Sequence, residues 1–530
     1  MNQNIYQKTS IGFQYKLPSC CLRRIYPHSW TLLVPGESRK LWFQAIMIFL
    51  LLILGEWTTS QAQSTNIDLA SVIHAAQSRS IAARRANTLQ ITQYWEWRSF
   101  KANYRPQVTL GGRVPGFSRT FEEVRQDNGS IKFQSIFQSN VFGEVFLSQP
   151  ISPTGGTIFM GTNLQRFDDL SPNPPFKRLY NATPVQFGFE QPLFRFNELK
   201  WAKKIEPLRY KESQQNFVMN MAAIAVQAVD LYFDVLLAQT DLSIARTNAA
   251  NTDTIFQITE EKYEMGKISR NDLLQIQLEK LKSAKALAAA EPEVEIAELT
   301  LRSYIGYGQQ ANWALSLPEA IPSLAINPAM ALSEANANRP DATAFVRREI
   351  EARQAVARAR GSTGFSANLV GAIGFTNSHE ALNKVYQSPI AQQTVSLEFN
   401  LPILDWGRAK SQVETAKANQ QLIMDDIEQD QRDFEQIILT ELSLFQQYEK
   451  QVSLNKEVDE FSQIRYQIAQ DRFLTGNLNI TDLIIAFQEK DRAKRDYIRS
   501  LWEYWRSYHR IRELTLYDFE RNQKLQFESN

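Results

Sequence analysis

Apolar and polar residues follow two different periods along the 530-residue chain. In 183–190 and 394–401 the two classes alternate residue by residue, which is typical of β-strands with one apolar and one polar face. The alternation then stops, and two long stretches follow whose interiors lack glycine, at about 197–263 and 407–473. The sequence therefore predicts strands that lead into very long helices.

Each long stretch has about 65 residues, enough for a helix roughly 100 Å long. A second helix is expected after each, at 273–304 and 483–514, so that each pair forms an antiparallel hairpin. Apolar side chains in the first long stretch recur at alternating intervals of four and three residues, the spacing of a coiled-coil seam. They are Val218, Ala222, Ala225, Val229, Tyr232 and Leu236.

A motif at the end of each long helix is repeated 210 residues later. One copy runs from Tyr263 to Leu273 and the other from Phe473 to Leu483. The matching pairs are Gly266 and Gly476, Ile268 and Leu478, Asp272 and Asp482, and, before the helices, Pro192 and Pro402. A constant offset indicates two copies of one supersecondary unit, each with glycine at the tip of its hairpin.

The two copies differ in the length of their strand regions. The first strand begins near Pro106, and its counterpart near Gly364, so copy one has 48 additional residues before the matching prolines. Those residues include the strand-like segments 141–150 and 157–165 around a Pro-Thr-Gly-Gly turn, which favours a hairpin. We expect four strands in copy one and two in copy two.

These features divide the chain into five segments. They are a signal peptide and N-terminal extension at 1–62, repeat one at 63–304 with a first helix at 68–102, an inter-repeat equatorial segment at 305–339, repeat two at 340–515 with a first helix at 341–360, and a C-terminal tail at 516–530. The equatorial segment is rich in glycine and proline and is expected to form loops with short helices.

The first 62 residues resemble an export signal. They carry a net charge of +4, whereas the whole chain carries +1. Arg39 and Lys40 precede the apolar run 41–54, and Ser60-Gln-Ala62 offers a small-x-small cleavage pattern. The run is shorter than the roughly 20 residues of a membrane-spanning helix. An uncleaved anchor is the alternative.

Composition argues against several classes of function. Cleavage would remove Cys20 and Cys21, leaving no thiol for a disulfide or a metal site, and His74, His379 and His509 are too dispersed for a histidine cluster. No GxSxG, HExxH, phosphate-loop or dinucleotide-binding motif occurs, so we expect no enzyme, cofactor or metal. A nearly neutral chain without a basic stripe is not expected to bind nucleic acid.

A strand with an entirely apolar face needs an apolar cover, and no helix alternates with these strands to supply one. In an exported protein, lipid can cover that face if the sheet closes on itself. Six strands are too few for a pore, so several chains must contribute, and the charged long helices must lie in water. The alternative is a non-conducting structural or adhesive coiled-coil protein of the envelope.

The repeated unit, from about Asp68 to Leu514, resembles the outer-membrane efflux family typified by TolC. Besides the two tip motifs, the segments 401–408 and 338–341 match that family. The resemblance implies a mixed α and transmembrane β fold, the two-repeat protomer of a trimeric outer-membrane β-barrel continued by a long periplasmic α-helical barrel. The family barrel has twelve strands, four per chain, and the sequence leaves open whether the additional residues enlarge it.

The resemblance also implies a function. The protein would be the outer-membrane channel subunit of a tripartite efflux or type I secretion system in a Gram-negative bacterium, conducting substrates passively from the periplasm. Its partners would be a periplasmic adaptor protein, an inner-membrane pump of RND or ABC type, outer-membrane lipid and two further copies of itself. The residues implied to contact the adaptor are Gly266, Ile268, Ser269, Asp272, Gly476, Leu478 and Asp482.

The resemblance places the periplasmic entrance at Asp482, Asp272 and Phe473. Rings of aspartate narrow this entrance in the family; Asp482 matches one such position, and Ile485 stands at the other. The alternative is that Asp482 caps its helix. The gate tyrosine and arginine of the family correspond to Phe473 and Leu478, which cannot make polar side-chain contacts with Asp272. We therefore expect closure by apolar packing, and only a small opening effect of Asp272→Ala.

Overall fold

The computed structural model describes residues 65–171, 176–306 and 313–527, all within one unit, Ser64–Asn530; the signal peptide expected at 1–62 lies outside them. The helices are α2 (Leu69–Arg79), α3 (Ile81–Ala102), α4 (Glu198–Glu264), α5 (Arg270–Ile305), α6 (Pro328–Asn338), α7 (Pro340–Thr363), α8 (Arg408–Leu474) and α9 (Ile480–Thr515). The strands are β1 (Thr65–Ile67), β2 (Gln107–Arg125), β3 (Ile131–Ile151), β4 (Gly156–Asp169), β5 (Lys177–Leu193), β6 (Trp313–Leu315), β7 (Ser366–His379), β8 (Ile390–Asn400), β9 (Tyr517–Asp518) and β10 (Gln523–Lys524).

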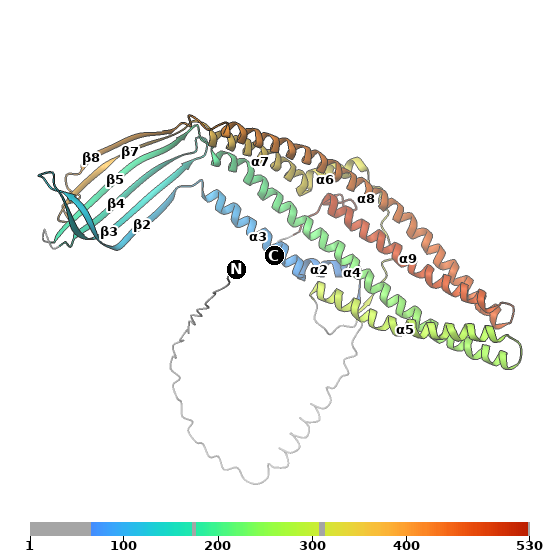
Figure 1. Cartoon of the computed structure of the whole chain (residues 1–530). Coiled ribbons are helices and arrows are strands. Elements are labelled where there is room, and N and C mark those ends of the chain that lie inside the picture. The colour runs from blue at the N-terminus through green and yellow to red at the C-terminus, as the bar shows by residue number, and fades with distance from the viewer. Residues whose placement is uncertain (1–64, 172–175, 307–312, 528–530) are drawn as a thin grey trace, which may run out of the picture. The chain divides into compact units, whose positions relative to one another are not determined.

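Six strands form one antiparallel sheet in the order β2-β3-β4-β5-β7-β8 (Figure 1). Four of them precede α4 and two lie between α7 and α8, the numbers that the sequence predicts. The first repeat's strands and the second repeat's strands join through β5 and β7, so the additional strands belong to the same sheet. β2 and β8 are its two edges.

The two faces of this sheet differ in chemistry. Paired residues place a row of apolar side chains across five strands: Val108, Leu147, Met160, Phe187 and Ile373. At least half of the surface of Val108, Phe187 and Ile373 is exposed. This side is called the apolar face below. The opposite, polar face carries side chains such as Glu144 and Gln165, as the period-two alternation predicts.

The long helices form two hairpins, α4 with α5 and α8 with α9 (Figure 1). The prediction of one helix over 68–102 is wrong, because α2 and α3 meet at Ser80. The Ser80 hydroxyl accepts a hydrogen bond from the backbone N–H of Ala83 at 3.0 Å, which caps α3. The second repeat has a similar break at Arg339, where Pro340 begins α7 because proline fits the first turn of a helix.

A large apolar core holds the middle of the helical region together. The residues of the predicted α4 seam are all buried or partly buried. The Tyr232 hydroxyl donates to the carbonyl oxygens of Ser316 and of Ile67, the latter at 3.2 Å, and so ties α4 to the β1–β6 pair. The Tyr504 hydroxyl donates in the same way to the Pro322 carbonyl. α4 has an apolar stretch long enough to cross a membrane, but most of it is buried among other helices.

We predict that Phe445→Ala destabilises the protein strongly. Only 1% of Phe445 is exposed, and its ring centroid lies 5.1 Å from that of Tyr504. Removing the ring leaves a cavity, so the free energy of unfolding should fall by about 3–5 kcal/mol in chemical denaturation. The exposed neighbour is the control: Gln446→Ala should change it by less than about 0.5 kcal/mol. Equal effects of the two substitutions would contradict the core described above.

Candidate functional site

The tip of the first hairpin is a glycine turn with a defined hydrogen-bond pattern. Gly266 has φ of 73°, in the left-handed region. Its N–H donates to the Tyr263 carbonyl at 2.8 Å, and the N–H of Lys267 donates to the Lys262 carbonyl at 2.9 Å. These two bonds form a Schellman motif. A Cβ at Gly266 would meet no atom within 4 Å, so the backbone angle, not space, favours glycine here.

The tip of the second hairpin repeats this geometry. Gly476 has φ of 80°, and its N–H donates to the Phe473 carbonyl at 3.1 Å. The N–H of Asn477 donates to the Arg472 carbonyl at 2.8 Å. The repeated motif in the sequence therefore encodes the same turn twice.

Each tip ends where a polar pair caps the returning helix. Ser269 caps α5: its hydroxyl accepts from the Asp272 N–H at 3.2 Å, and its own N–H donates to the Asp272 carboxylate at 3.1 Å. Asn479 caps α9: its side chain accepts from the Asp482 N–H and donates to the Asp482 carboxylate, both at 2.8 Å. The alternative that Asp482 itself is the cap is wrong, because Asn479 holds that position.

The two tips lie side by side and pack against each other through apolar side chains (Figure 1). Phe473 is only 7% exposed. The buried members of this tip cluster are Ile255, Ile276, Tyr466, Ala469, Phe473, Ile480, Leu483 and Ala486. Two hairpins that are far apart in the sequence are thereby joined at their ends.

A cavity of about 550 Å³ lies between the tips. The predicted tip residues that line it are Gly266, Ile268, Ser269, Asp272, Phe473, Gly476 and Leu478. Asp482 is exposed and does not line this cavity. Within the described part of the chain, no group of three or more His, Cys, Asp or Glu side chains is placed to hold a metal ion.

Lys262 makes a contact between the tips that the sequence did not suggest. Its Nζ donates to the Phe473 carbonyl at 3.3 Å and lies 4.9 Å from the centroid of that ring. Arg472 holds the equivalent place in the second repeat, but its guanidinium bonds the carbonyl of Asn477 within its own tip, at 3.3 Å. The available signal was a basic residue four positions before each tip glycine.

A polar contact thus accompanies the expected apolar packing. It uses a backbone carbonyl, so it needs no hydroxyl at position 473. A second cross-tip contact is weaker, from the Gln275 amide to the Thr481 hydroxyl at 3.3 Å. The side chain of Asp272 bonds Ser269 of its own tip.

Comparison with known families decides the identity of this fold. A family model described as "outer membrane efflux protein" matches residues 158–307 and 331–515. The chain belongs to the outer membrane efflux protein family. It is accordingly an outer-membrane channel subunit of tripartite efflux that extends into the periplasm. The match begins within β4, so β2 and β3 precede the matched region.

Solved structures support the same fold for this efflux protein. The CmeC outer membrane channel of Campylobacter jejuni is 15% identical, with a TM-score of 0.59 over 87% of each chain. The MtrE outer membrane channel of Neisseria gonorrhoeae, in its open state, is 16% identical, with a TM-score of 0.58 over 84% of this chain and 88% of its own. VceC of Vibrio cholerae is 13% identical, with a TM-score of 0.58 over 84% of this chain and 95% of its own. No curated protein matches the chain in sequence.

We predict that Lys262→Met loosens the contact between the tips. A partly exposed cation–π and carbonyl contact contributes about 1 kcal/mol in each chain, so the open state should gain at least roughly fivefold in population. Single-channel recordings in planar bilayers measure this as more frequent or longer openings.

Two matched variants test the assignment. Lys267→Met removes the same charge from the same tip, where the described structure has no side-chain hydrogen bond or ion pair for Lys267. Asp272→Ala removes a carboxylate bonded only within its own tip. Both should open the channel less than Lys262→Met, and an Asp272→Ala effect larger than that of Lys262→Met would overturn this account of the tips.

Proposed function

We propose that three copies of this chain close their sheets into one transmembrane barrel, continued by an α-helical barrel in the periplasm. The supporting observation is a six-stranded sheet with one apolar, exposed face and two unpaired edges. β2 runs away from the helices and β8 runs toward them, so β8 of one copy and β2 of the next would pair antiparallel. Three such sheets would give eighteen strands.

Closure would satisfy two physical requirements together. The edge strands would exchange backbone hydrogen bonds, which lipid cannot supply, and the apolar face would turn toward lipid. The polar face would then line a water-filled lumen. Substrates would cross it passively, because the chain carries no motif for an energy-supplying reaction.

The tips would form the periplasmic entrance and meet the other members of the machine. In this proposal the tips contact a periplasmic adaptor protein, which couples the channel to an inner-membrane pump of RND or ABC type. The contacting residues are Gly266, Ile268, Ser269, Asp272, Gly476, Leu478 and Asp482. Exposure of both tip turns supports a docking role. Opening would separate the two tips, breaking the Lys262 contact and the cluster around Phe473. Asp272 and Asp482 would surround the entrance.

We predict that the purified protein gives discrete, cation-selective conductance steps in planar bilayers. A carboxylate roughly 10 Å from a passing ion contributes about 0.4 kcal/mol in water, and about 0.15 kcal/mol at roughly 0.1 M salt, where the Debye length is about 10 Å. Three copies of Asp482 would attract a cation and repel an anion by about 0.45 kcal/mol each, a difference of about 0.9 kcal/mol between the two ions. Asp482→Asn should therefore lower the cation-to-anion permeability ratio roughly fivefold in asymmetric salt.

The control is Asp425→Asn, an exposed carboxylate on α8 far along the chain from the tip, which should leave selectivity unchanged. If Asp482→Asn leaves the permeability ratio unchanged, the role of Asp482 is limited to its hydrogen bond with Asn479. A heat-resistant trimer that conducts nothing, with or without Lys262→Met, would favour the non-conducting envelope protein instead.

A further inference from the structure

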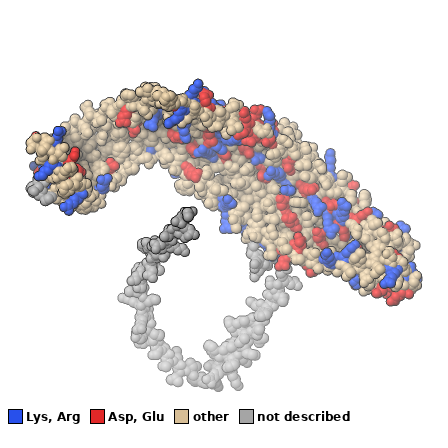
Figure 2. Space-filling model, in the orientation of Figure 1, with Lys and Arg blue, Asp and Glu red and all other residues tan. Residues whose placement is uncertain are grey.

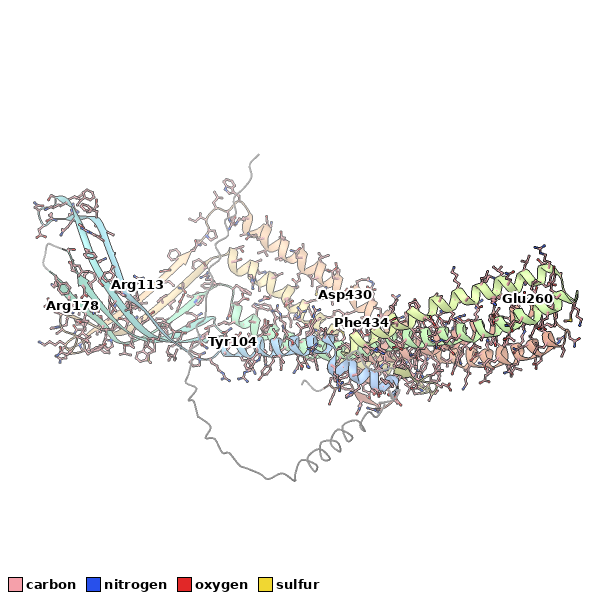
Figure 3. All side chains as sticks on the ribbon, turned by 90° about the horizontal axis from the view of Figure 1, so that it is seen from below. Tyr104, Arg113, Arg178, Glu260, Asp430 and Phe434 are labelled. Atoms are coloured by element: carbon pink, nitrogen blue, oxygen red, sulfur yellow. The ribbon has the colours of Figure 1, made fainter. Side chains whose placement is uncertain are left out.

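The apolar face carries a cluster of charged side chains where the strands end farthest from the helices. Alternate residues of a strand share a face, so Arg166 and Asp168 of β4 lie on the same face as Ile158 and Met160. Asp168 pairs directly with Arg178 of β5, which brings Arg178 to that face. Figure 3 labels Arg178 near the end of the sheet that lies away from the helices. This Arg166–Asp168–Arg178 group is called the arginine cluster below.

The arginine cluster holds more positive charge than its carboxylate neutralises. Asp168 Oδ1 lies 2.7 Å from Arg178 Nε, and Asp168 Oδ2 lies 2.8 Å from Arg166 Nη2. The Asp168 side chain is 6% exposed, whereas those of Arg166 and Arg178 are 39% and 41% exposed. The buried Nε of Arg166 has no hydrogen-bond partner in the described structure. Two guanidiniums on one carboxylate leave a net charge of +1 and N–H donors for another acceptor.

β2 and β3 extend this basic surface beyond the other strands. Residues 131–136 of β3 pair with β2 alone, because the pairing with β4 stops at Gln138 and Phe137 makes the last bonds on that side, to Leu170 and Ser171. Beyond its bulge, β2 places Arg119 and Arg125 on the same face as the arginine cluster, with Glu123 between them. Figure 2 shows Lys and Arg side chains gathered at this end of the sheet. The four arginines and two acids of this surface carry a net charge of +2.

The position of the cluster suits a lipid headgroup. Arg166 lies ten residues beyond Gly156, the first residue of β4, about 33 Å along the strand at roughly 3.3 Å per residue. At a strand tilt of about 40°, this length corresponds to a height of about 25 Å. The apolar band of a barrel in the outer membrane is about 25 Å tall. The arginines therefore lie where an apolar band that includes Ile158 ends, at the boundary with the headgroups of the outer leaflet. Guanidinium forks match phosphate oxygens in geometry and charge.

We propose that the arginine cluster binds the phosphorylated headgroup of an outer-leaflet lipid, whose acyl chains lie along the apolar face. This inference rests on the proposed function, which turns that face toward lipid. Arg166 and Arg178 supply the charge-assisted hydrogen bonds, and Asp168 competes with the phosphate for their N–H donors. The extended part of β2 adds Arg119 and exposed aromatic surface at Phe117 and Phe121 beside the headgroup.

The test uses the full protein in nanodiscs of phosphatidylethanolamine that contain lipid A, a phosphorylated glycolipid. Native mass spectrometry counts the lipid A molecules that stay bound to the trimer after release into detergent. The double variant Arg166→Gln/Arg178→Gln should retain roughly tenfold less lipid A. Arg113→Gln is the matched control, since Arg113 pairs with Phe142 on the polar face and its loss should change nothing. Equal retention by the wild type and the double variant would overturn the proposal.

Two further measurements distinguish a lipid-binding site from an ion-pair cluster that only joins β4 to β5, and from a site for free phosphate. Asp168→Asn frees both guanidiniums, so retention of lipid A should rise; a fall equal to that of the arginine variants would mean that the cluster only holds β4 to β5. Dephosphorylated lipid A should bind weakly to the wild type, and millimolar inorganic phosphate should not displace lipid A; displacement would identify a free-phosphate site instead. Trimer content and conductance are recorded on the same samples, so failure of the barrel itself is seen separately.

Discussion

The structure depends on one constraint, the need to satisfy the backbone groups of a sheet whose exposed face is apolar. Within one chain the sheet ends at β2 and β8, and each of these edges presents unpaired N–H and C=O groups. Water would satisfy those groups but would not cover side chains such as Val108 and Ile373, which are 68% and 60% exposed. Lipid would cover the side chains but not the edges. The proposed pairing between chains would resolve the conflict, and the long helices would then follow the strands out of the membrane.

The middle of the helical region and the hairpin tips are stabilised by different contacts. In the middle, aromatic side chains such as Tyr232 and Tyr504 are fully buried and bond loop carbonyls, which fixes the irregular segments against the helices. At the tips the contacts are fewer: one apolar cluster, the Lys262 contact and the bond from Gln275 to Thr481, beside a cavity. A region that must open is expected to have low local stability. The distribution of contacts therefore supports the proposal that the middle of the helical region stays fixed while the tips separate.

The sequence predicted the features that depend on a local pattern or on the internal repeat. Alternation located the strands, absence of glycine located α4 and α8, and the offset of 210 residues located both tips. It did not predict the break at Ser80, because a single serine among good helix formers is a weak signal. It also missed the Lys262 contact, which joins residues 211 positions apart and depends on how the hairpins pack. Positions of the segment boundaries and the roles of the tip residues stay predictions.

The most direct test of the account is disulfide cross-linking between the two edge strands of neighbouring chains. In a protein with Cys20 and Cys21 replaced by serine, Leu110→Cys in β2 is combined in turn with cysteine at successive positions of β8, such as Val395 and Ser396. Closure of one barrel by three chains predicts covalent trimers after oxidation at alternate β8 positions, those on the apolar face. Trimers that form without any β2–β8 cross-link, or cross-links indifferent to the face, would contradict closure of one barrel by three chains.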